Sequence, residues 1–462
     1  MFIGREKELA QLREDLASNR KTIALLYGKR RIGKTTLIQE AVKAFHGTVV
    51  NYLCVRSSYR GNMELLSRCI ADAVGLPSGL RFTTLMDAFE FLDKQNQPVL
   101  VILDEYQYLK ESGKTYEVDS YMQAVIDRLS PAVRVILCGS YISVMKELLE
   151  EGNPLFGRFS LIMHLTELDY LTASRFYEKE SPIRKIENYA IFGGSPYVLS
   201  EIDSRMSIRD NIIRYLLPST GILRSYIENV MLREIQKAYD VRILECIGNG
   251  RKKYSEIDSM LGNERNGLLD KQLKNLLNME TLEKESPINK PDDNKKKFYV
   301  ISDNLMRFYF TYIFGKTGQL LRLGEDAFWE NEIEPSIHEF ISRRFEGIAR
   351  QYFEIQVQKG NMKGIYDIGA FWYDDPISKT SGEFDCVLKR KGCYDFYECK
   401  LRKTPMNRQQ CQKEAAQVLK LSGIIPVGKI GFVCSSGFSF ESDSYELITG
   451  RSLFQPEKAA KE

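Results

Sequence analysis

The sequence predicts a multidomain protein of the α/β class, and three observations support this assignment. The chain has 462 residues, more than one ordinary hydrophobic core accommodates, so roughly two to four domains are expected. Over residues 1–165, short apolar runs alternate with amphipathic helical segments, which is typical of a parallel sheet covered by helices on both faces. After residue 366, strand-like segments return around a short glycine-containing turn.

The composition excludes several classes of protein. Hydrophobic residues make up 43% of the chain and charged residues 27%, and 65 basic against 62 acidic residues give a net charge of +3, so any nucleic-acid surface must be local. No apolar run approaches the roughly 18 residues of a membrane span, and no secretory signal is recognisable at the start. Nine cysteines without a C-x-x-C pair and only three histidines disfavour zinc or disulfide frameworks. We therefore expect a cytoplasmic protein without a membrane partner.

The first motif is a glycine-rich loop between a strand and a helix. Residues 22–27 form an apolar run, and residues 36–45 carry apolar side chains at helical spacing. The loop between them fits G-x-x-x-x-G-K-[ST], and its candidate nucleotide-binding residues are Gly28, Lys29, Arg30, Arg31, Ile32, Gly33, Lys34, Thr35 and Thr36. Backbone N–H groups and the helix N-terminus would cradle the phosphates of ATP. Lys34 would reach the β- and γ-phosphates, and Thr35 would bind Mg²⁺. The alternative, a chance glycine turn, is disfavoured by the flanking strand and helix.

The second motif is an apolar strand that ends in two acidic residues. Residues 98–103 are all apolar, and Asp104 and Glu105 follow directly. Parallel strands deliver such residues to the carboxyl edge of the sheet, where ligands bind. Asp104 would bind Mg²⁺ through water, and Glu105 would act as the general base that polarises the attacking water. Acidic residues also cap turns, but behind a phosphate loop we favour the catalytic interpretation.

Further elements of this region follow in order. Residues 6–16 predict a helix with Leu9, Leu12 and Leu16 on one face, residues 48–55 a strand, and residues 62–74 and 85–94 helices. Residues 134–140 predict a buried strand whose last residue, Ser140, is a candidate sensor of the γ-phosphate. Arg158 lies in a predicted turn, where it would contact either a nucleotide or a surface carboxylate.

Six short segments together match those of a known group. They are F-x-G-R-E-x-E-L at residues 2–9, the loop at 28–35, L-D-E-Y-Q-Y-L at 103–109, G-S at 139–140, P-L-F-G-R at 154–158 and G-G-S-P-Y at 193–197. In combination they resemble the archaeal-type P-loop ATPases of the AAA+ and STAND assemblage. The resemblance implies ATP binding, a helical lid after about residue 166, and residues 193–196 near the nucleotide.

The middle of the chain predicts helices and a small hairpin. Residues 168–177, 184–192 and 207–216 read as lid helices, and residues 239–248, 255–261 and 266–279 as three further helices. Strand-like residues 282–285 and 298–301 complete the pattern of a winged helix. Its third helix, with Lys271 and Lys274, and the wing residues Lys295, Lys296 and Lys297 would contact DNA. Neighbouring acidic residues leave a protein-binding winged helix equally open. The aromatic segment 303–314 predicts a buried packing helix.

The last region carries a second cluster of acidic residues. If Lys391 and Gly392 form a two-residue hairpin loop, the numbers of paired residues sum to 783, so that Asp385 lies opposite Glu398 and Glu383 opposite Lys400. All four side chains then share one face, with opposed Cβ atoms about 5 Å apart. Two opposed carboxylates could share Mg²⁺, and Lys400 could hold a water that attacks phosphorus. The alternative is a set of surface ion pairs worth at most ~1 kcal/mol.

This arrangement resembles the PD-(D/E)xK nuclease fold. The resemblance assigns Asp385 as the metal-binding aspartate, Glu398 and Lys400 as the E-x-K pair, and Glu346, on the predicted helix 333–352, as a further acid. The sequence departs from the family in having Glu383 and Phe384 where the literal motif has proline before Asp385. Residues 408–421 predict the helix that follows, and residues 429–435 a late strand.

These inferences combine into one hypothesis for the whole chain. The predicted domains are a P-loop ATPase core at 1–165, a helical lid at 166–235, a winged helix at 236–315 and a nuclease-like α/β domain at 316–462. ATP and Mg²⁺ are the expected cofactors, and nucleic acid, with DNA preferred, is the expected partner, alongside a homo-oligomer or protein partner. The nucleotide state would control a nucleic-acid-binding or nuclease module. The alternative is a nucleotide-controlled regulator or scaffold whose nuclease-like domain is catalytically silent.

Overall fold

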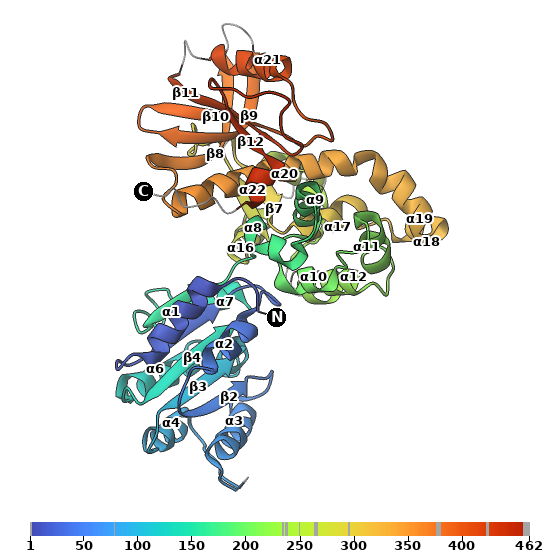
Figure 1. The fold of residues 1–462 in the computed structure, drawn as a ribbon. Helices are drawn as coiled ribbons and strands as arrows, with labels where there is room; N and C mark the ends of the chain where they lie inside the picture. Colours follow the sequence, from blue (N-terminus) through green and yellow to red (C-terminus); the bar gives the residue numbers. More distant parts are fainter. Residues whose placement is uncertain are drawn as a thin grey trace. The chain divides into compact units, whose positions relative to one another are not determined.

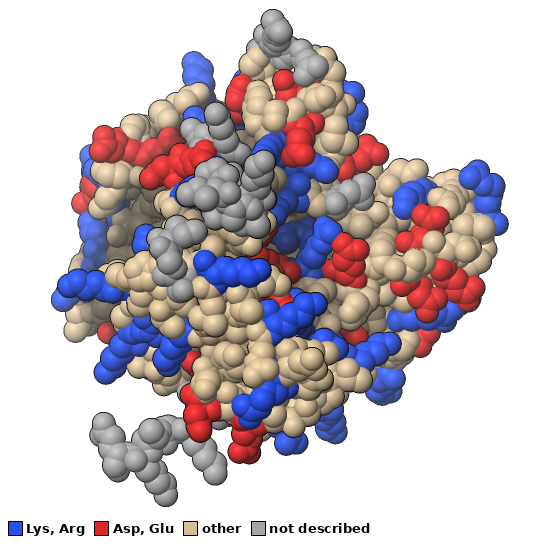
Figure 2. All heavy atoms as spheres, turned by 90° about the horizontal axis from the view of Figure 1, so that it is seen from above, with Lys and Arg blue, Asp and Glu red and all other residues tan. Residues whose placement is uncertain are grey.

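The computed structural model divides the chain into two compact units, Met1–Glu167 and Leu168–Glu462 (Figure 1). The residues that it describes are 2–77, 79–232, 235, 239–248, 250–262, 267–293, 296–375, 380–421 and 425–455. The first boundary lies close to the predicted end of the ATPase core, whereas the finer division of the second unit at residues 235 and 315 stays a prediction. Basic and acidic side chains are interspersed on the face drawn in Figure 2, in keeping with the small net charge.

The first unit is built on a five-stranded, fully parallel sheet. Its strand order is β2-β3-β4-β1-β5, so the strands that carry the two nucleotide motifs, β1 and β3, flank β4. The strands are β1 (Ile23–Tyr27), β2 (Thr48–Leu53), β3 (Val99–Asp104), β4 (Val133–Gly139) and β5 (Leu161–His164). The central strands are apolar on both faces because helices cover both sides, as the sequence predicted.

Two hydrophobic cores lie on the two faces of this sheet. Alternate strand residues such as Leu25 and Val101 pack with one set of helices, and their neighbours such as Leu26 and Ile102 pack with the other. The first set comprises α3 (Tyr59–Val74), α4 (Leu85–Asp93), α5 (Tyr106–Lys110), α6 (Glu117–Arg128) and α7 (Ile142–Glu147). The second comprises α1 (Glu6–Ala17) and α2 (Lys34–Val42), which adjoin each other.

The second unit begins with short helices that would form the lid. They are α8 (Tyr170–Ala173), η1 (Ser174–Tyr177), α9 (Pro182–Phe192), α10 (Pro196–Glu201), α11 (Ile208–Tyr215), α12 (Ile222–Tyr226) and η2 (Ile227–Met231). Serine side chains cap two of them: Ser181 accepts from the N–H of Arg184 at the start of α9, and Ser207 accepts from the N–H of Asp210 at the start of α11. Their buried faces join a core that continues to Leu453, so they do not form a separate hydrophobic core.

Three helices and a two-stranded sheet follow in the order predicted. They are α14 (Arg242–Gly248), α15 (Tyr254–Met260), α16 (Leu268–Asn278), β6 (Leu282–Glu285) and β7 (Phe298–Ile301), with β6 and β7 antiparallel. Lys271 and Lys274 are exposed on α16, and Lys295 lies outside the described residues.

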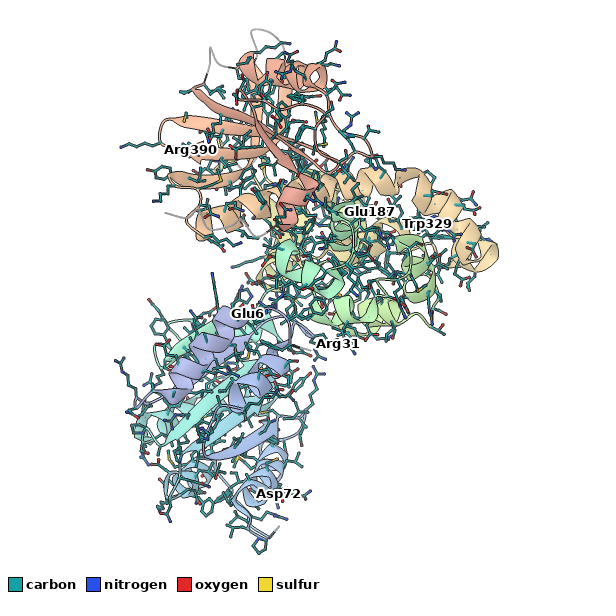
Figure 3. All side chains as sticks on the ribbon, in the orientation of Figure 1. Glu6, Arg31, Asp72, Glu187, Trp329 and Arg390 are labelled. Carbon is teal, nitrogen blue, oxygen red and sulfur yellow. The ribbon has the colours of Figure 1, made fainter. Side chains whose placement is uncertain are left out.

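A run of helices joins this segment to the last domain. It consists of α17 (Asn304–Tyr312), α18 (Thr317–Leu323), α19 (Glu325–Phe328), η4 (Trp329–Ile333) and the long α20 (Glu334–Gln358). The aromatic side chains of α17 are buried, which confirms that this segment is a packing helix. Trp329, labelled in Figure 3, is also buried in the shared core.

The C-terminal sheet has five strands in the order β12-β11-β10-β9-β8. Its elements are β8 (Ile365–Asp375), β9 (Thr380–Arg390), β10 (Cys393–Lys400), α21 (Arg408–Leu419), β11 (Val427–Cys434), β12 (Glu446–Thr449) and α22 (Gly450–Phe454). Strands β8, β9 and β10 are antiparallel, whereas β11 runs parallel to β10 after the crossover helix α21. At the hairpin turn, Arg390 (labelled in Figure 3) pairs with buried Asp395 and holds the two strands together.

Candidate functional site

The glycine-rich loop connects β1 to α2 in a conformation that its glycines permit. A Cβ atom on Gly28 would lie 2.1 Å from the backbone oxygen of Leu165, so no side chain fits there. Gly33 adopts a left-handed conformation, with φ of 96°, and α2 begins directly after it. The loop therefore delivers Lys34 and Thr35 into the first turn of a helix, where backbone N–H groups are free to bind an anion.

The Lys34 side chain is buried inside the loop. Its Nζ donates to the backbone oxygens of Gly28 at 2.8 Å and Lys29 at 2.9 Å. Burial lowers the pKa of Lys34, and the neighbouring Cys138, Glu105 and Asp104 act in the opposite direction. The ammonium group thus lies at the centre of the loop, where it can exchange backbone carbonyls for phosphate oxygens.

The residues predicted to bind Mg²⁺ meet at the end of β3. The Thr35 hydroxyl donates to Oδ2 of Asp104 at 3.3 Å, and Asp104 is the last residue of β3. A hydroxyl and a carboxylate beside the phosphate loop are oxygen ligands of the kind that Mg²⁺ takes. This donor set fits a magnesium ion that would also bind the phosphates of ATP.

The predicted base and the predicted sensor are in direct contact. Oε2 of Glu105 accepts from the Ser140 hydroxyl at 2.6 Å and from its backbone N–H at 3.3 Å. The amide nitrogen of Gln107 also donates to this carboxylate oxygen. Ser140 therefore holds the Glu105 carboxylate at the carboxyl edge of the sheet, and a change at either residue would be transmitted to the other.

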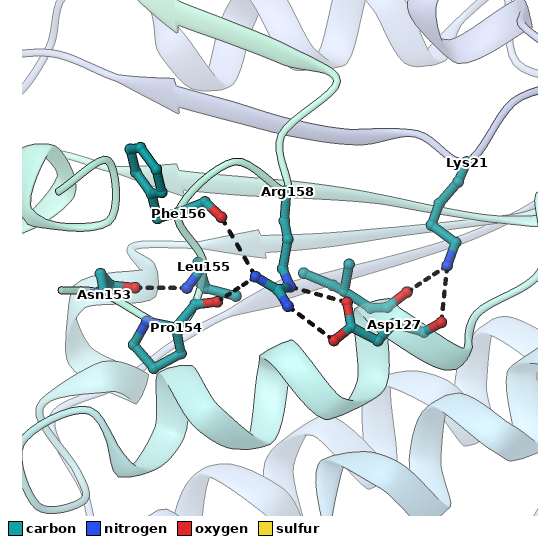
Figure 4. Close-up of polar contacts among 8 residues, drawn as sticks. Lys21, Asp127, Asn153, Pro154, Leu155, Phe156 and Arg158 are labelled. Atoms are coloured by element: carbon teal, nitrogen blue, oxygen red, sulfur yellow. Dashed lines mark hydrogen bonds and ion pairs between the residues drawn. The ribbon is translucent and has the colours of Figure 1, made fainter. Parts of the chain in front are cut away.

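Arg158 is not brought to the phosphate loop. It precedes β5, at the edge where the parallel strands begin, and its guanidinium donates to both carboxylate oxygens of Asp127, at 2.9 and 3.0 Å (Figure 4). It also donates to the backbone oxygens of Pro154 and Phe156. Of the two interpretations of Arg158, the structure shows the contact with a surface carboxylate.

The hairpin of the C-terminal sheet has the predicted register. Lys391 and Gly392 form its loop, and the strand pairs run from Cys393 opposite Arg390 to Tyr397 opposite Cys386, each summing to 783. The next pair in this register is Asp385 and Glu398. The pairing runs as far as Tyr397 and Cys386, so the opposed placement of the two carboxylates predicted to share a metal ion follows from continuing this register by one residue on each strand.

Glu383 and Lys400, which the sequence predicts to lie opposite each other, form their ion pairs with other residues. Nζ of Lys400 binds Oε1 of Glu398 at 2.5 Å, whereas Glu383 receives both Nη atoms of Arg251, which precedes α15. A two-residue spacing places Glu398 and Lys400 on the same face of β10, so their contact is compatible with the predicted E-x-K pair.

Glu346 of α20 lies close enough to Asp385, Glu383 and Glu398 for their charges to act on it, and these four residues are called the acidic group below. Burial, followed by the charge of Asp385, raises the pKa of Glu346 to about 8. Burial, followed by the charges of Glu398 and Glu383, raises the pKa of Asp385 to about 6. Across the described parts of the chain, no group of three or more His, Cys, Asp or Glu side chains is arranged to hold a metal ion as it stands. The mutual repulsion of these carboxylates is nevertheless what a bound cation would relieve, and Mg²⁺ requires only one or two of them.

Comparison with known proteins connects these sites to two families. Residues 2–202 match the family described as an ATPase domain predominantly from Archaea, which extends over the whole first unit and helices α8 to α10. The chain carries an ATPase domain of this archaeal type. Residues 309–414 match a family of archaeal and bacterial proteins of unknown function, which spans α20 and the β8–β10 strands.

Relatives and a solved structure agree with this assignment. An uncharacterized protein of Methanocaldococcus jannaschii is 29% identical over 379 residues, which are 81% of this chain and 82% of the relative. An uncharacterized ATP-binding protein of Pyrococcus horikoshii is 25% identical over 173 residues, covering 37% of this chain and 52% of that protein. The Walker-type ATPase of Pyrococcus abyssi has a similar fold, with a TM-score of 0.50 at 20% identity, covering 67% of this chain and 96% of that one.

The ATPase domain contains contacts that the sequence did not reveal. Arg30 of the loop donates to the Tyr108 hydroxyl at 2.7 Å, and Arg56 donates to the Tyr141 hydroxyl at 2.9 Å. Each guanidinium also lies over the ring of the other tyrosine, at 5.4 and 5.1 Å. The tyrosines follow β3 and β4, so only the strand order, and no local spacing, brings them to the ATPase loop.

One negative observation concerns membranes. Among the helices formed by the described residues, none combines the length and apolar character that crossing a bilayer requires.

The raised carboxyl pKa values predict a pH-dependent stability of the second unit. A carboxyl group whose pKa is higher in the folded than in the unfolded chain stabilises the folded state most at a pH below its ordinary pKa, which is about 4.3 for glutamate. This contribution is lost as the pH rises through the pKa of the folded state. Without divalent cations, the unfolding temperature of this unit should therefore fall between pH 5 and pH 8.5, and Glu346→Gln should flatten the fall. Differential scanning calorimetry measures both. A fall of equal size in the variant would show that Glu346 is not its source.

Proposed function

We propose that ATP binding and hydrolysis in the first unit control a metal-dependent nuclease site in the second. One observation above all supports the nuclease site: the hairpin pairs in the register that the sequence predicted as far as Cys386 and Tyr397, so that Asp385 and Glu398 are the next residues on the two strands, beside the Glu398–Lys400 pair. Glu346, on the helix preceding the sheet, adds the acid that the resemblance to PD-(D/E)xK nucleases implied, and the charge of Asp385 contributes to its raised pKa. DNA is the nucleic acid that we prefer, because exposed Lys271 and Lys274 lie on the third helix of the predicted winged helix.

In the ATPase site, the chain positions both the nucleotide and the attacking water. The loop backbone and Lys34 would bind the phosphates, and Thr35 with Asp104 would hold the ion. Bound Mg²⁺ would stabilise the negative charge that develops on the transferred phosphate. The Glu105 carboxylate then orients water by hydrogen bonding, for which it must turn from Ser140 and Gln107 toward the nucleotide.

In the nuclease-like site, the strand carboxylates and the lysine have separate tasks. Asp385 and Glu398 would hold Mg²⁺ or Mn²⁺, which supplies charge stabilisation at the scissile phosphate. Lys400, already within 2.5 Å of Glu398, holds a water beside them and assists its deprotonation. Glu383, whose charge contributes to the raised pKa of Asp385, is paired with Arg251 and is therefore less available as a metal ligand.

The test is cleavage of end-labelled single- and double-stranded DNA with Mg²⁺ or Mn²⁺, with and without ATP. The wild-type protein should cleave, and Lys400→Ala should lose cleavage while retaining ATPase activity. If no condition yields wild-type cleavage, the alternative is favoured: a nucleotide-controlled regulator or scaffold whose C-terminal domain does not cleave. Cleavage that persists in a clean Lys400→Ala preparation would refute the role of this lysine.

A further inference from the structure

A cavity of about 650 Å³ lies within the second unit, beside the acidic group. One wall is formed by α20, a second by β8 and β9, and a third by residues 250–251 together with the segments around β6 and β7. Glu346 and Asp385 both line it. Pockets of 300–1,000 Å³ bind small molecules, so this volume suits a single nucleotide better than a DNA duplex.

The cavity is lined by an unusual number of arginines. They are Arg251, Arg307, Arg343, Arg344 and Arg350. Three of them have carboxylate partners: Arg251 pairs with Glu383, Arg307 with Glu283 and Arg343 with Glu339. Their charges are thus already compensated within the chain.

Arg344 and Arg350 differ from the other three. No carboxylate of the described chain lies within ion-pair distance of either, and the Nε atoms of both are shielded from solvent without a hydrogen-bond partner. Arg344 reaches only the Phe340 backbone oxygen, at 3.5 Å, and the Phe340 ring. Burial and the charge of Arg307 lower the pKa of Arg344 to about 9. Burial makes the Arg344 cation costly, and a bound anion would remove that cost. Burial also opposes the charge of Arg350, but Glu285 and Glu346 outweigh it and raise the pKa of Arg350, so this residue would contribute N–H donors and not an uncompensated charge.

We propose that Arg344 and Arg350 form a phosphate-binding site that receives one phosphorylated nucleotide next to Glu346 and Asp385. Guanidinium groups bind phosphate through paired N–H donors, and both side chains offer such donors toward one cavity. The nucleotide is the end of a nucleic-acid strand, because a cavity of this size admits a terminal residue and excludes a continuous duplex. This inference rests on the proposed nuclease function, whose carboxylates lie in the same cavity.

The chain offers a reporter for this site. It contains two tryptophans, of which Trp372 lines the cavity and Trp329 lies in the shared core. In the Trp329→Phe protein, the fluorescence of Trp372 can be followed while a 5′-phosphorylated single-stranded oligonucleotide is added. EDTA prevents cleavage, and Lys34→Ala in the same protein prevents binding at the ATPase loop. The same oligonucleotide with a 5′-hydroxyl, thymidine monophosphate and inorganic phosphate are titrated in parallel.

The phosphorylated oligonucleotide should bind at least about tenfold more tightly than the hydroxyl form, a difference of about 1.4 kcal/mol that one charge-assisted contact can supply. Arg344→Gln and Arg350→Gln should each abolish that preference, and Arg344→Lys should restore part of it. Arg322→Gln, which changes an exposed arginine of α18, is the matched control and should bind normally. Tighter binding of thymidine monophosphate than of the strand would identify a free nucleotide as the source of the phosphate.

Two results would overturn the proposal: equal affinity for phosphorylated and hydroxyl strands, or an unchanged preference in both glutamine variants that fold normally by calorimetry. Because the titration requires no cleavage, it separates this proposal from the nuclease assignment. An arginine-dependent phosphate preference without any cleavage would leave the binding site standing and remove the nuclease function. Cleavage that depends on Lys400, without a preference for the phosphorylated strand, would support the nuclease function and refute the phosphate-binding site.

Discussion

Lys34→Ala is expected to abolish nucleotide binding, and Glu105→Gln to preserve binding while slowing hydrolysis. Lys34 is buried in the loop with its donors directed to two loop carbonyls, so its loss removes the charge that would face the β- and γ-phosphates. Two charge-assisted contacts correspond to at least about a hundredfold weaker binding. Loss of a general base lowers turnover by about 10²- to 10⁴-fold. Isothermal titration with ATP and a phosphate-release assay measure the two effects.

Lys43→Ala is the matched control for this experiment. Lys43 directly follows α2, the helix that Lys34 begins, but it is exposed and pairs only with Glu40. It should bind and hydrolyse ATP as the wild type does. Normal turnover in both Lys34→Ala and Glu105→Gln would refute the assigned roles. Normal turnover in Glu105→Gln alone would indicate that another residue at the same edge of the sheet is the general base.

Asp385→Asn is expected to lower DNA cleavage by at least about a hundredfold and to leave ATP hydrolysis unchanged. The substitution keeps the shape of the side chain but removes one of the opposed charges that would hold the metal ion. Metal stabilisation of a developing charge is worth several kcal/mol, and about 3 kcal/mol already corresponds to a hundredfold change in rate. Cleavage of labelled DNA over a series of Mg²⁺ and Mn²⁺ concentrations measures the effect.

The control is Asp443→Asn, an exposed aspartate in the segment between β11 and β12. It should retain full cleavage, which would exclude a general effect of removing a negative charge from this domain. The assignment of Asp385 fails if the Asp385→Asn protein cleaves at the wild-type rate at every metal concentration. A parallel loss of ATPase activity would indicate misfolding or coupling between the sites, and calorimetry distinguishes these.

The parts of the fold that the sequence predicted depend on short spacings. The loop from Gly28 to Thr35 is defined by consecutive residues, and the hairpin register follows from a two-residue turn at Lys391 and Gly392. In both cases local geometry determines which side chains meet. The strand ends at Asp104 and Ser140 were predictable for the same reason, because the apolar runs stop there.

The contacts that the sequence did not predict join distant segments. Arg251 and Glu383 are 132 residues apart, and nothing near either residue indicates the other. Arg344 and Arg350 occupy ordinary helix positions, and only the packing of α20 against the sheet places them in a cavity. Arg158 binds Asp127 on a neighbouring helix, although an arginine in a turn can equally well bind a phosphate. Pairing of this kind depends on tertiary packing, which propensities and periodicity do not encode.

The extended core of the second unit has a consequence for how the chain folds during synthesis. The Tyr170 hydroxyl donates to the backbone oxygen of Leu453, 283 residues later, and α22 packs on α9. The first unit closes its own sheet once β5 has left the ribosome, so it can fold during translation. The helices from α8 onward pack partly on nearer segments, such as α17 on α9, but their core is completed only when α22 is added, nearly three hundred residues after α8. At 5–20 residues per second, synthesis of those residues takes roughly 15 to 60 seconds, during which the part of the core that α22 covers stays open to solvent. We therefore expect the second unit to depend more on chaperones than the first.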